Sequence, residues 1–276
     1  MNSIAMKCPA KLNLNLSIIG KRIDGMHEIN TQFQLINLFD DMLIEKTSNK
    51  NINVKTNTSL SIDGRKNIVF KAIEALSEYT GKEISCDVNI EKNIPIGGGL
   101  GGGSSNAAAA LIGTNILFQL GLSSENLREI GVKLGADVPF FIYGKNAHAT
   151  GIGDEFLEEK SINKKKYLLL FPQVESSTQE LFTEWDKLSR HDQEMIGENE
   201  ENSFLPLFLH KYKEVNIVFN DLLKMNTPRL SGTGSTIFYE YSDNDDIKKT
   251  LKKIPSKWRH SFCEPLQCSP LLTYLT

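Results

Sequence analysis

The sequence predicts an α+β fold in two parts. Stretches with a hydrophobic period of two, typical of strands, are mixed with stretches whose apolar residues recur at helical spacing. No strict strand–helix–strand order connects them, which disfavours a parallel α/β fold. Apolar residues make up 40% of the 276 residues, enough for a sizeable core. A strand-rich half gives way to a smaller half near residues 155–165, so we expect an N-terminal domain of residues 1–160 and a C-terminal domain of residues 161–276.

The first half is expected to begin with a strand. Within residues 10–19 (AKLNLNLSII), leucines alternate with one lysine and two asparagines. A period of two places the leucines on a core-facing side and leaves an ammonium and two amides in a row on the other side. Residues 20–25 (GKRIDG) then have the composition of a turn.

The other elements of the first half follow from the same two periodicities. Strands are expected at residues 29–36, 42–46, 52–55, 86–91, 140–143 and 147–150. Helices are expected at residues 68–79, ended by Gly81, at residues 104–120, and from the cap Ser123 to Gly135.

The second half contains a capping-box pattern, Ser177-x-x-Glu180, which predicts a helix that ends near Leu188. Residues 191–202 are acidic and poor in apolar side chains, so we expect a solvated loop or linker there. The remaining expected elements are strands at residues 166–171, 236–241 and 258–263 and helices at residues 203–225 and 245–253.

Composition disfavours several classes of protein. The formal net charge is −3, so a nucleic-acid partner is not expected. No window of ~18 apolar residues and no signal-peptide pattern occurs, so we expect a cytoplasmic protein without a membrane partner. The four cysteines form no C-x-x-C pair and have no histidine cluster beside them. They are interpreted as reduced structural residues, not as zinc ligands.

A glycine-rich segment at residues 95–106 (PIGGGLGGGSSN) is the most informative part of the chain. Six of the chain's twenty glycines fall within residues 97–103, between a strand and an alanine-rich helix. Glycine lets several backbone N–H groups face one concavity, and a following helix adds free N–H groups and the positive end of its dipole. The segment therefore predicts a nest for a di- or triphosphate.

Three other interpretations of this segment fit the sequence less well. A flexible linker would not be placed between a clean strand and a strong helix. The Walker A motif requires a lysine before the serine, and Gly103-Ser104-Ser105 has none. The dinucleotide fingerprint fits Gly97-x-Gly99-x-x-Gly102 formally, but it requires a second strand after the helix, where this chain starts another helix.

Three motifs, taken in order along the chain, resemble those of the GHMP kinases. They are residues 9–14 (PAKLNL), the glycine segment at residues 95–106, and residues 231–234 (SGTG). Residues 20–27 (GKRIDGMH), 135–140 (GADVPF) and 269–271 (SPL) narrow the resemblance to the members that act on a cytidine-diphosphate-linked methylerythritol alcohol. The resemblance implies a two-domain GHMP kinase fold with an active-site cleft between the domains. It also implies phosphorylation of the substrate's 2-hydroxyl by ATP, in non-mevalonate isoprenoid precursor biosynthesis.

The resemblance also implies roles for individual residues. Lys11 and Asp137 correspond to the catalytic pair, and magnesium is expected with ATP, with Ser105 as a candidate contact. The substrate pocket would include Asn13, Met26, His27, Ile152 and Phe182. The ATP-binding residues would be Pro95, Ile96, Gly97, Gly98, Gly99, Leu100, Gly101, Gly102, Gly103, Ser104, Ser105 and Asn106.

The residue types suit phosphoryl transfer, which needs anchored phosphates, a positioned hydroxyl and charge balance. Asp137 can accept the hydroxyl proton, and the Lys11 ammonium can balance charge and keep that carboxylate ionised. The plain alternatives are a turn residue for Asp137, a solvated strand residue for Lys11, an exposed loop residue for His27 and a helix-core residue for Phe182.

One position departs from the family pattern. The residue before the histidine is commonly a tyrosine that stacks on the cytosine base, and in this chain it is Met26. A thioether can pack on a flat ring, but it stacks less well, so base recognition should differ here.

Two alternative functions stay open from sequence. One is another GHMP-type kinase, acting on homoserine, mevalonate or a sugar. The other is a nucleotide-binding regulator that has lost catalysis, which the presence of both Lys11 and Asp137 disfavours.

Overall fold

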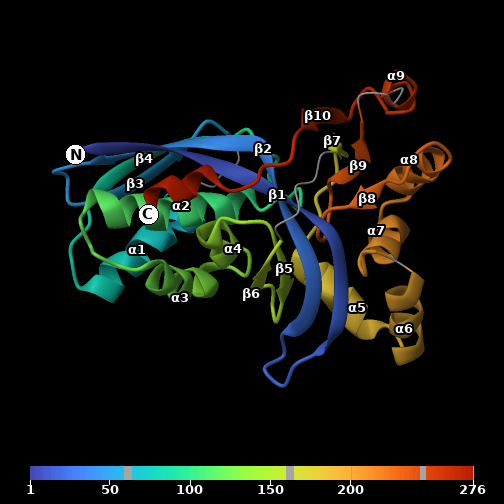
Figure 1. Ribbon diagram of the computed structural model, residues 1–276, viewed down its shortest axis with the longest axis horizontal. Helices are drawn as coiled ribbons and strands as arrows, with labels where there is room; N and C mark the ends of the chain where they lie inside the picture. Colours follow the sequence, from blue (N-terminus) through green and yellow to red (C-terminus); the bar gives the residue numbers. More distant parts are fainter. Residues whose placement is uncertain (59–63, 160–164, 200, 243–246, 276) are drawn as a thin grey trace.

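The computed structural model describes residues 1–58, 64–159, 165–199, 201–242 and 247–275. A six-stranded sheet with helices on one face forms one end of the molecule, and a four-stranded sheet surrounded by shorter helices forms the other (Figure 1). This mixture of helices and sheets is the expected α+β class. None of the helices in the described part of the chain has the length and apolar character needed to span a membrane.

The larger sheet is built on a long antiparallel hairpin of β1 (Ser3–Lys21) and β2 (His27–Lys46). The other edge of β2 pairs with two separate strands, one near each of its ends. The remaining strands of this sheet are β3 (Ile52–Thr56), β4 (Cys86–Glu91), β5 (Ala147–Thr150) and β6 (Glu155–Glu158). The helices are α1 (Ile68–Thr80), α2 (Gly102–Leu117), α3 (Ser124–Leu134) and α4 (Val138–Tyr143).

The smaller sheet is antiparallel, in the order β10-β7-β9-β8. Its strands are β7 (Lys166–Phe171), β8 (Arg229–Leu230), β9 (Ile237–Tyr241) and β10 (Arg259–Cys263). The helices of this half are α5 (Thr178–Lys187), α6 (Arg190–Asn199), α7 (Leu205–Lys211), α8 (Lys213–Leu223) and α9 (Ile247–Leu251). Short 3-10 helices cover Gly64–Lys66 and Pro270–Tyr274.

Strand β1 connects the two halves because its side chains enter more than one core. Leu12 and Leu14 pack in a cluster that also contains Tyr167 and Phe238 of the smaller sheet. Leu16, further along the same strand, packs among the helices of the second half. The chain end also returns to the first half, where Leu271 is fully buried. The division into domains at residue 160 stays a prediction.

Both expected N-cap serines accept a backbone hydrogen bond, but the capping box predicted at Ser177-x-x-Glu180 is only half formed, and the Glu180 carboxylate pairs with Lys211 of α7. The Ser123 hydroxyl accepts a hydrogen bond from the backbone N–H of Asn126, whose side chain completes the capping box. The Ser177 hydroxyl accepts one from the backbone N–H of Glu180. Gly81 has φ 66° and ends α1 as predicted. These features depend on neighbours in sequence, which is why sequence alone could locate them.

Several predicted elements are wrong. Residues 140–143 belong to helix α4, because a short apolar run does not distinguish a buried helix from a strand. Residues 190–199 form helix α6, which the Ser189 hydroxyl caps by accepting from the Asp192 N–H. The helix expected at residues 203–225 is two helices, separated at Tyr212. Strands β6 and β8 were not expected, and residues 245 and 246 lie outside the described part of the chain.

Candidate active site

A cleft of about 540 Å³ lies where the two halves meet. The first half contributes the middle of β1, the glycine loop before α2, and the residues around Asp137. The second half contributes α5 and the turn before β9. Eleven of the twelve predicted ATP-binding residues line this cleft; the exception is the fully buried Ser105.

Three carbonyl groups of the glycine loop accept hydrogen bonds from neighbouring parts of the protein. The carbonyl oxygens of Gly98 and Leu100 accept hydrogen bonds from the backbone N–H groups of Thr236 and Lys11, at 3.1 and 3.0 Å. The carbonyl of Gly99 accepts one from the Ser231 hydroxyl at 3.0 Å. Because these carbonyls are bonded to protein donors, the loop's N–H groups are favoured to face the cleft. An anion site needs N–H groups in that orientation.

Helix α2 begins at the end of this loop without a side-chain cap. Its N-cap is Gly101, at φ 70°, and within the described part of the chain no side chain caps the first-turn N–H groups. Uncapped N–H groups and the helix dipole favour an anion at this position.

Close packing explains two of the glycines. A Cβ at Gly99 would lie 2.2 Å from the carbonyl oxygen of Ser231, and one at Gly101 would lie 2.7 Å from the ring of Phe141. Protein atoms therefore occupy the space next to both positions and leave no room for a side chain there.

Lys11 and Asp137 lie side by side in the cleft, with 3.2 Å between the lysine Nζ and the Asp137 Oδ2. Lys11 is only 3% exposed, so its interpretation as a solvated strand residue is wrong. Its ammonium also donates to the Asn13 Oδ1 and lies 5.0 Å from the ring centroid of Phe33. The amide nitrogen of Asn13 donates to the Thr31 hydroxyl, which turns the amide oxygen toward Lys11.

Asp137 precedes helix α4 and makes no capping hydrogen bond with its side chain. Its carboxylate is 31% exposed and faces the cleft. A carboxylate that is partly exposed and paired with a buried ammonium can accept a proton from a bound hydroxyl. The geometry therefore brings together the two groups that the sequence placed 126 positions apart.

The predicted substrate residues divide into two groups. Asn13, Ile152 and Phe182 line the cleft. Met26 does not, and it is 47% exposed at the far end of the β1–β2 hairpin. His27 lies behind the lining, where its ring stacks on Phe182 with 4.7 Å between centroids.

His27 is held from the second half of the molecule. Its Nε2 lies 2.7 Å from the Asp186 Oδ1, and the other oxygen of that carboxylate contacts the Lys21 ammonium. Burial raises the pKa of Asp186, but the hydrogen bonds and charges of Lys21 and His27 outweigh it, so the pKa lies below its ordinary value of 3.8. His27 is thus not the freely exposed loop residue of the plain alternative.

Sequence reasoning missed several residues that line the cleft. The polar ones are Lys66, Asn67, Lys92 and Thr178; Thr233 also lines the cleft, but it belongs to the SGTG motif that the sequence had already singled out. Lys92 comes directly after strand β4, and its position just ahead of the glycine loop was the only sequence signal for it. Thr178 contacts the Thr233 hydroxyl at 2.9 Å, so α5 and the SGTG turn are joined at the cleft wall.

A family model described as the GHMP kinases N terminal domain matches residues 67–145, which contain the glycine loop and Asp137. Two curated relatives, both 4-diphosphocytidyl-2-C-methyl-D-erythritol kinases, are similar along nearly their whole lengths. The protein of Acinetobacter baumannii is 40% identical over 92% of this chain and 93% of its own. That of Haemophilus ducreyi is 36% identical over 98% of this chain and 97% of its own.

Solved structures agree with the relatives. A crystal structure of 4-(cytidine 5'-diphospho)-2C-methyl-D-erythritol kinase matches with a TM-score of 0.74 and 26% identity, over 95% of this chain and 99% of that one. The mevalonate kinase of Methanococcus jannaschii matches with a TM-score of 0.71 and 16% identity, over 95% and 98% of the two chains, and shows a shared fold. On these similarities, this chain belongs to the 4-diphosphocytidyl-2-C-methyl-D-erythritol kinase family within the GHMP kinases.

Proposed function

We propose that this kinase transfers the γ-phosphate of ATP to the 2-hydroxyl of 4-diphosphocytidyl-2-C-methyl-D-erythritol, in non-mevalonate isoprenoid precursor biosynthesis. The observation that carries the proposal is the Lys11–Asp137 pair, 3.2 Å apart, in one cleft with the glycine loop. Membership in a family of relatives named for this substrate supports the choice of alcohol.

In this proposal the glycine loop holds the phosphates of ATP. Backbone amides at residues 97–103 and the uncapped start of α2 donate to phosphate oxygens. Donors that are already in place need no reorganisation when charge moves during transfer.

Asp137 accepts the proton of the acceptor hydroxyl as the oxygen attacks the γ-phosphorus, while the bond from that phosphorus to the β,γ-bridging oxygen breaks and ADP leaves. Lys11 keeps that carboxylate ionised and balances the charge on the transferring group. Asn13 keeps the ammonium in position through its amide oxygen. The apolar wall formed by Ile152 and Phe182 lies in the same cleft and suits a flat base.

Magnesium would be bound in this site mainly by the phosphate oxygens of the nucleotide. No group of three potential ligands among His, Cys, Asp and Glu occurs in the described part of the chain. Magnesium commonly keeps its waters and binds substrate phosphates. The hydroxyl of Ser105, the candidate contact from sequence, has no hydrogen-bond partner among the described residues, but Ser105 is fully buried and does not line the cleft, so it does not fit a direct contact with the ion. Bound to the nucleotide phosphates, the ion would neutralise their charge.

The test is a substrate panel with the purified full-length protein. Each candidate alcohol is incubated with ATP and magnesium, and the products are analysed by mass spectrometry. We expect a phosphate mass gain on 4-diphosphocytidyl-2-C-methyl-D-erythritol and none on homoserine, mevalonate or a hexose. Phosphorylation of one of these three instead would assign another GHMP-type reaction. ATP binding without any phosphorylated product would identify a silent regulator.

A further inference from the structure

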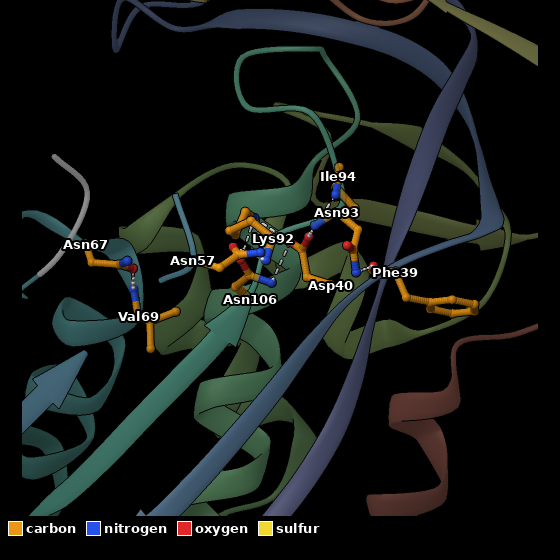
Figure 2. A network of polar contacts seen from close by, with 9 residues as sticks. All are labelled: Phe39, Asp40, Asn57, Asn67, Val69, Lys92, Asn93, Ile94 and Asn106. Carbon is orange, nitrogen blue, oxygen red and sulfur yellow. Dashed lines mark hydrogen bonds and ion pairs between the residues drawn. The ribbon is translucent and has the colours of Figure 1, made fainter. Parts of the chain in front are cut away.

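One fully buried carboxylate lies behind the glycine loop, outside the catalytic pair. Asp40, near the middle of strand β2, is 0% exposed. Its Oδ1 accepts from the backbone N–H groups of Asn93 and Ile94, at 2.7 and 2.9 Å. Its Oδ2 accepts from the Lys92 ammonium and from the side-chain amide of Asn106, the latter at 3.0 Å. Figure 2 shows these groups converging on the carboxylate.

The partners of Asp40 all belong to the nucleotide side of the cleft. Asn93 and Ile94 form the entry to the glycine loop, and Asn106 lies in the second turn of α2, where the loop ends. Both ends of the loop are therefore attached to one side chain of β2. The backbone N–H of Lys92 also donates to the Asn57 side chain at 2.8 Å, which attaches the loop entry to the end of β3 (Figure 2).

Lys92 extends this cluster to the surface of the cleft. Its ammonium donates to the Asn106 Oδ1 at 2.8 Å as well as to Asp40, and the residue lines the cleft. A Cβ at Gly102 would lie 3.5 Å from this ammonium. An ammonium next to the loop backbone is thus held in place by Asp40 and Asn106.

A buried charge pair is costly to desolvate and is often no more stable than apolar residues of the same size. The two oxygens of a carboxylate can accept about four hydrogen bonds, and here all the donors come from the loop region and its lysine. Such a carboxylate is suited to holding the loop in one conformation. We propose that Asp40 is a positioning residue for the nucleotide subsite: it fixes both ends of the phosphate loop and the Lys92 ammonium. The inference rests on the proposed function, because it assigns the loop to ATP.

The test compares Asp40→Asn, Lys92→Met and the double variant with the wild-type protein. In Asp40→Asn the amide nitrogen would face two donors, so Lys92 and Asn106 lose their acceptor. We expect each single variant to weaken ATP binding about tenfold, and the double variant to weaken it about as much as one single variant, since the residues act as a unit. ATP affinity is measured by calorimetry without the alcohol, and KM is measured for both substrates.

If Asp40 only stabilised the fold, its substitution would affect KM for ATP and KM for the alcohol alike. We expect KM for ATP to rise while KM for the alcohol stays within about twofold and kcat changes little. Glu240→Gln is the matched control. It disrupts the ion pair with Arg229, 2.7 Å away in the second half, and should lower the melting temperature without changing ATP affinity.

The possible outcomes are distinguishable. Folded Asp40→Asn or Lys92→Met protein with wild-type ATP affinity would overturn the inference alone, as would equal rises in both KM values. If Asp40→Asn does not fold, Lys92→Met decides, since it keeps the carboxylate and its two backbone hydrogen bonds. A wild-type protein that does not bind ATP would overturn the proposed function and this inference together.

Discussion

At the scale of single residues, Lys11 raises the question of how an ammonium remains in an almost closed site. A buried charge without partners would be very unfavourable. Lys11 has three: the Asp137 carboxylate, the Asn13 amide oxygen and the face of the Phe33 ring. Two of these contacts do not involve Asp137, so the lysine stays anchored when the carboxylate is altered.

This anchoring leads to a prediction for Asp137→Asn, which keeps the shape of the side chain but removes its charge. Loss of the proton acceptor should lower kcat on the order of a hundredfold or more, while ATP affinity and the melting temperature stay close to wild type. Steady-state kinetics, calorimetry and thermal unfolding measure the three quantities. A parallel loss of ATP binding, turnover and folding would instead show that Asp137 is structural.

At the scale of elements, the glycine loop combines positive φ angles with close contacts to the turn before β9. Gly97 and Gly99 have nearly the same φ, at 68° and 72°. They differ in their surroundings, because a Cβ at Gly97 would meet no atom within 4 Å and one at Gly99 would overlap the carbonyl of Ser231. The two positions therefore separate the cost of the backbone angle from the cost of the contact.

Alanine substitutions at these two positions should have unequal effects. Gly97→Ala should cost roughly 1–2 kcal/mol in the free energy of unfolding, from the positive φ alone. Gly99→Ala should cost roughly 1–3 kcal/mol more, because it forces the loop away from the turn, and should raise KM for ATP. Urea denaturation and ATP kinetics measure the two effects, and equal behaviour of the variants would refute the close-contact argument.

At the scale of the whole molecule, the β1–β2 hairpin connects the two ends of the structure. The end of the hairpin near its turn lies beside helix α5 (Figure 1), where Asp186 contacts both Lys21 and His27. Phe182 of the same helix stacks on His27 and lines the cleft. The shape of the cleft's apolar wall thus depends on a contact between segments about 160 residues apart.

The pH dependence of this contact follows from the lowered pKa of Asp186. A carboxyl group whose folded-state pKa is depressed stabilises the fold above its unfolded pKa, and that stability is lost as pH falls through the folded value. Asp186→Asn should therefore lower the melting temperature at pH 7 by roughly 2–4 °C, about 1 kcal/mol in a chain of this size. The difference in melting temperature between the wild-type protein and Asp186→Asn should become smaller below about pH 4.

The control for this variant is Glu184→Gln on the same helix. Glu184 forms its ion pair with Lys187 within α5, and its side chain is 45% exposed. It should therefore change the melting temperature much less. A gap between wild type and Asp186→Asn that does not vary from pH 7 to pH 3 would show that the ion pair is not its cause.

Features that depend on neighbours in sequence could be predicted from sequence. The period of two at residues 10–19, the caps Ser123 and Ser177 and the glycine loop involve local geometry. The family also followed from sequence, because its motifs are contiguous. Helix α6 is an instructive failure, since composition suggested a loop while one serine at its start stabilises a helix.

Only the tertiary structure decided which polar groups are buried and which of them meet. The polar face of β1 was expected as a strand surface, but Asp137, the glycine loop and the SGTG turn lie against it, so that Lys11 and Asn13 are buried. Asp40 and Asp186 carried no sequence signal, because their partners are distant in the chain and come together only when the strands pair. Sequence alone thus determined the local chemistry of this protein, whereas long-range packing decided the environment in which each charge has to act.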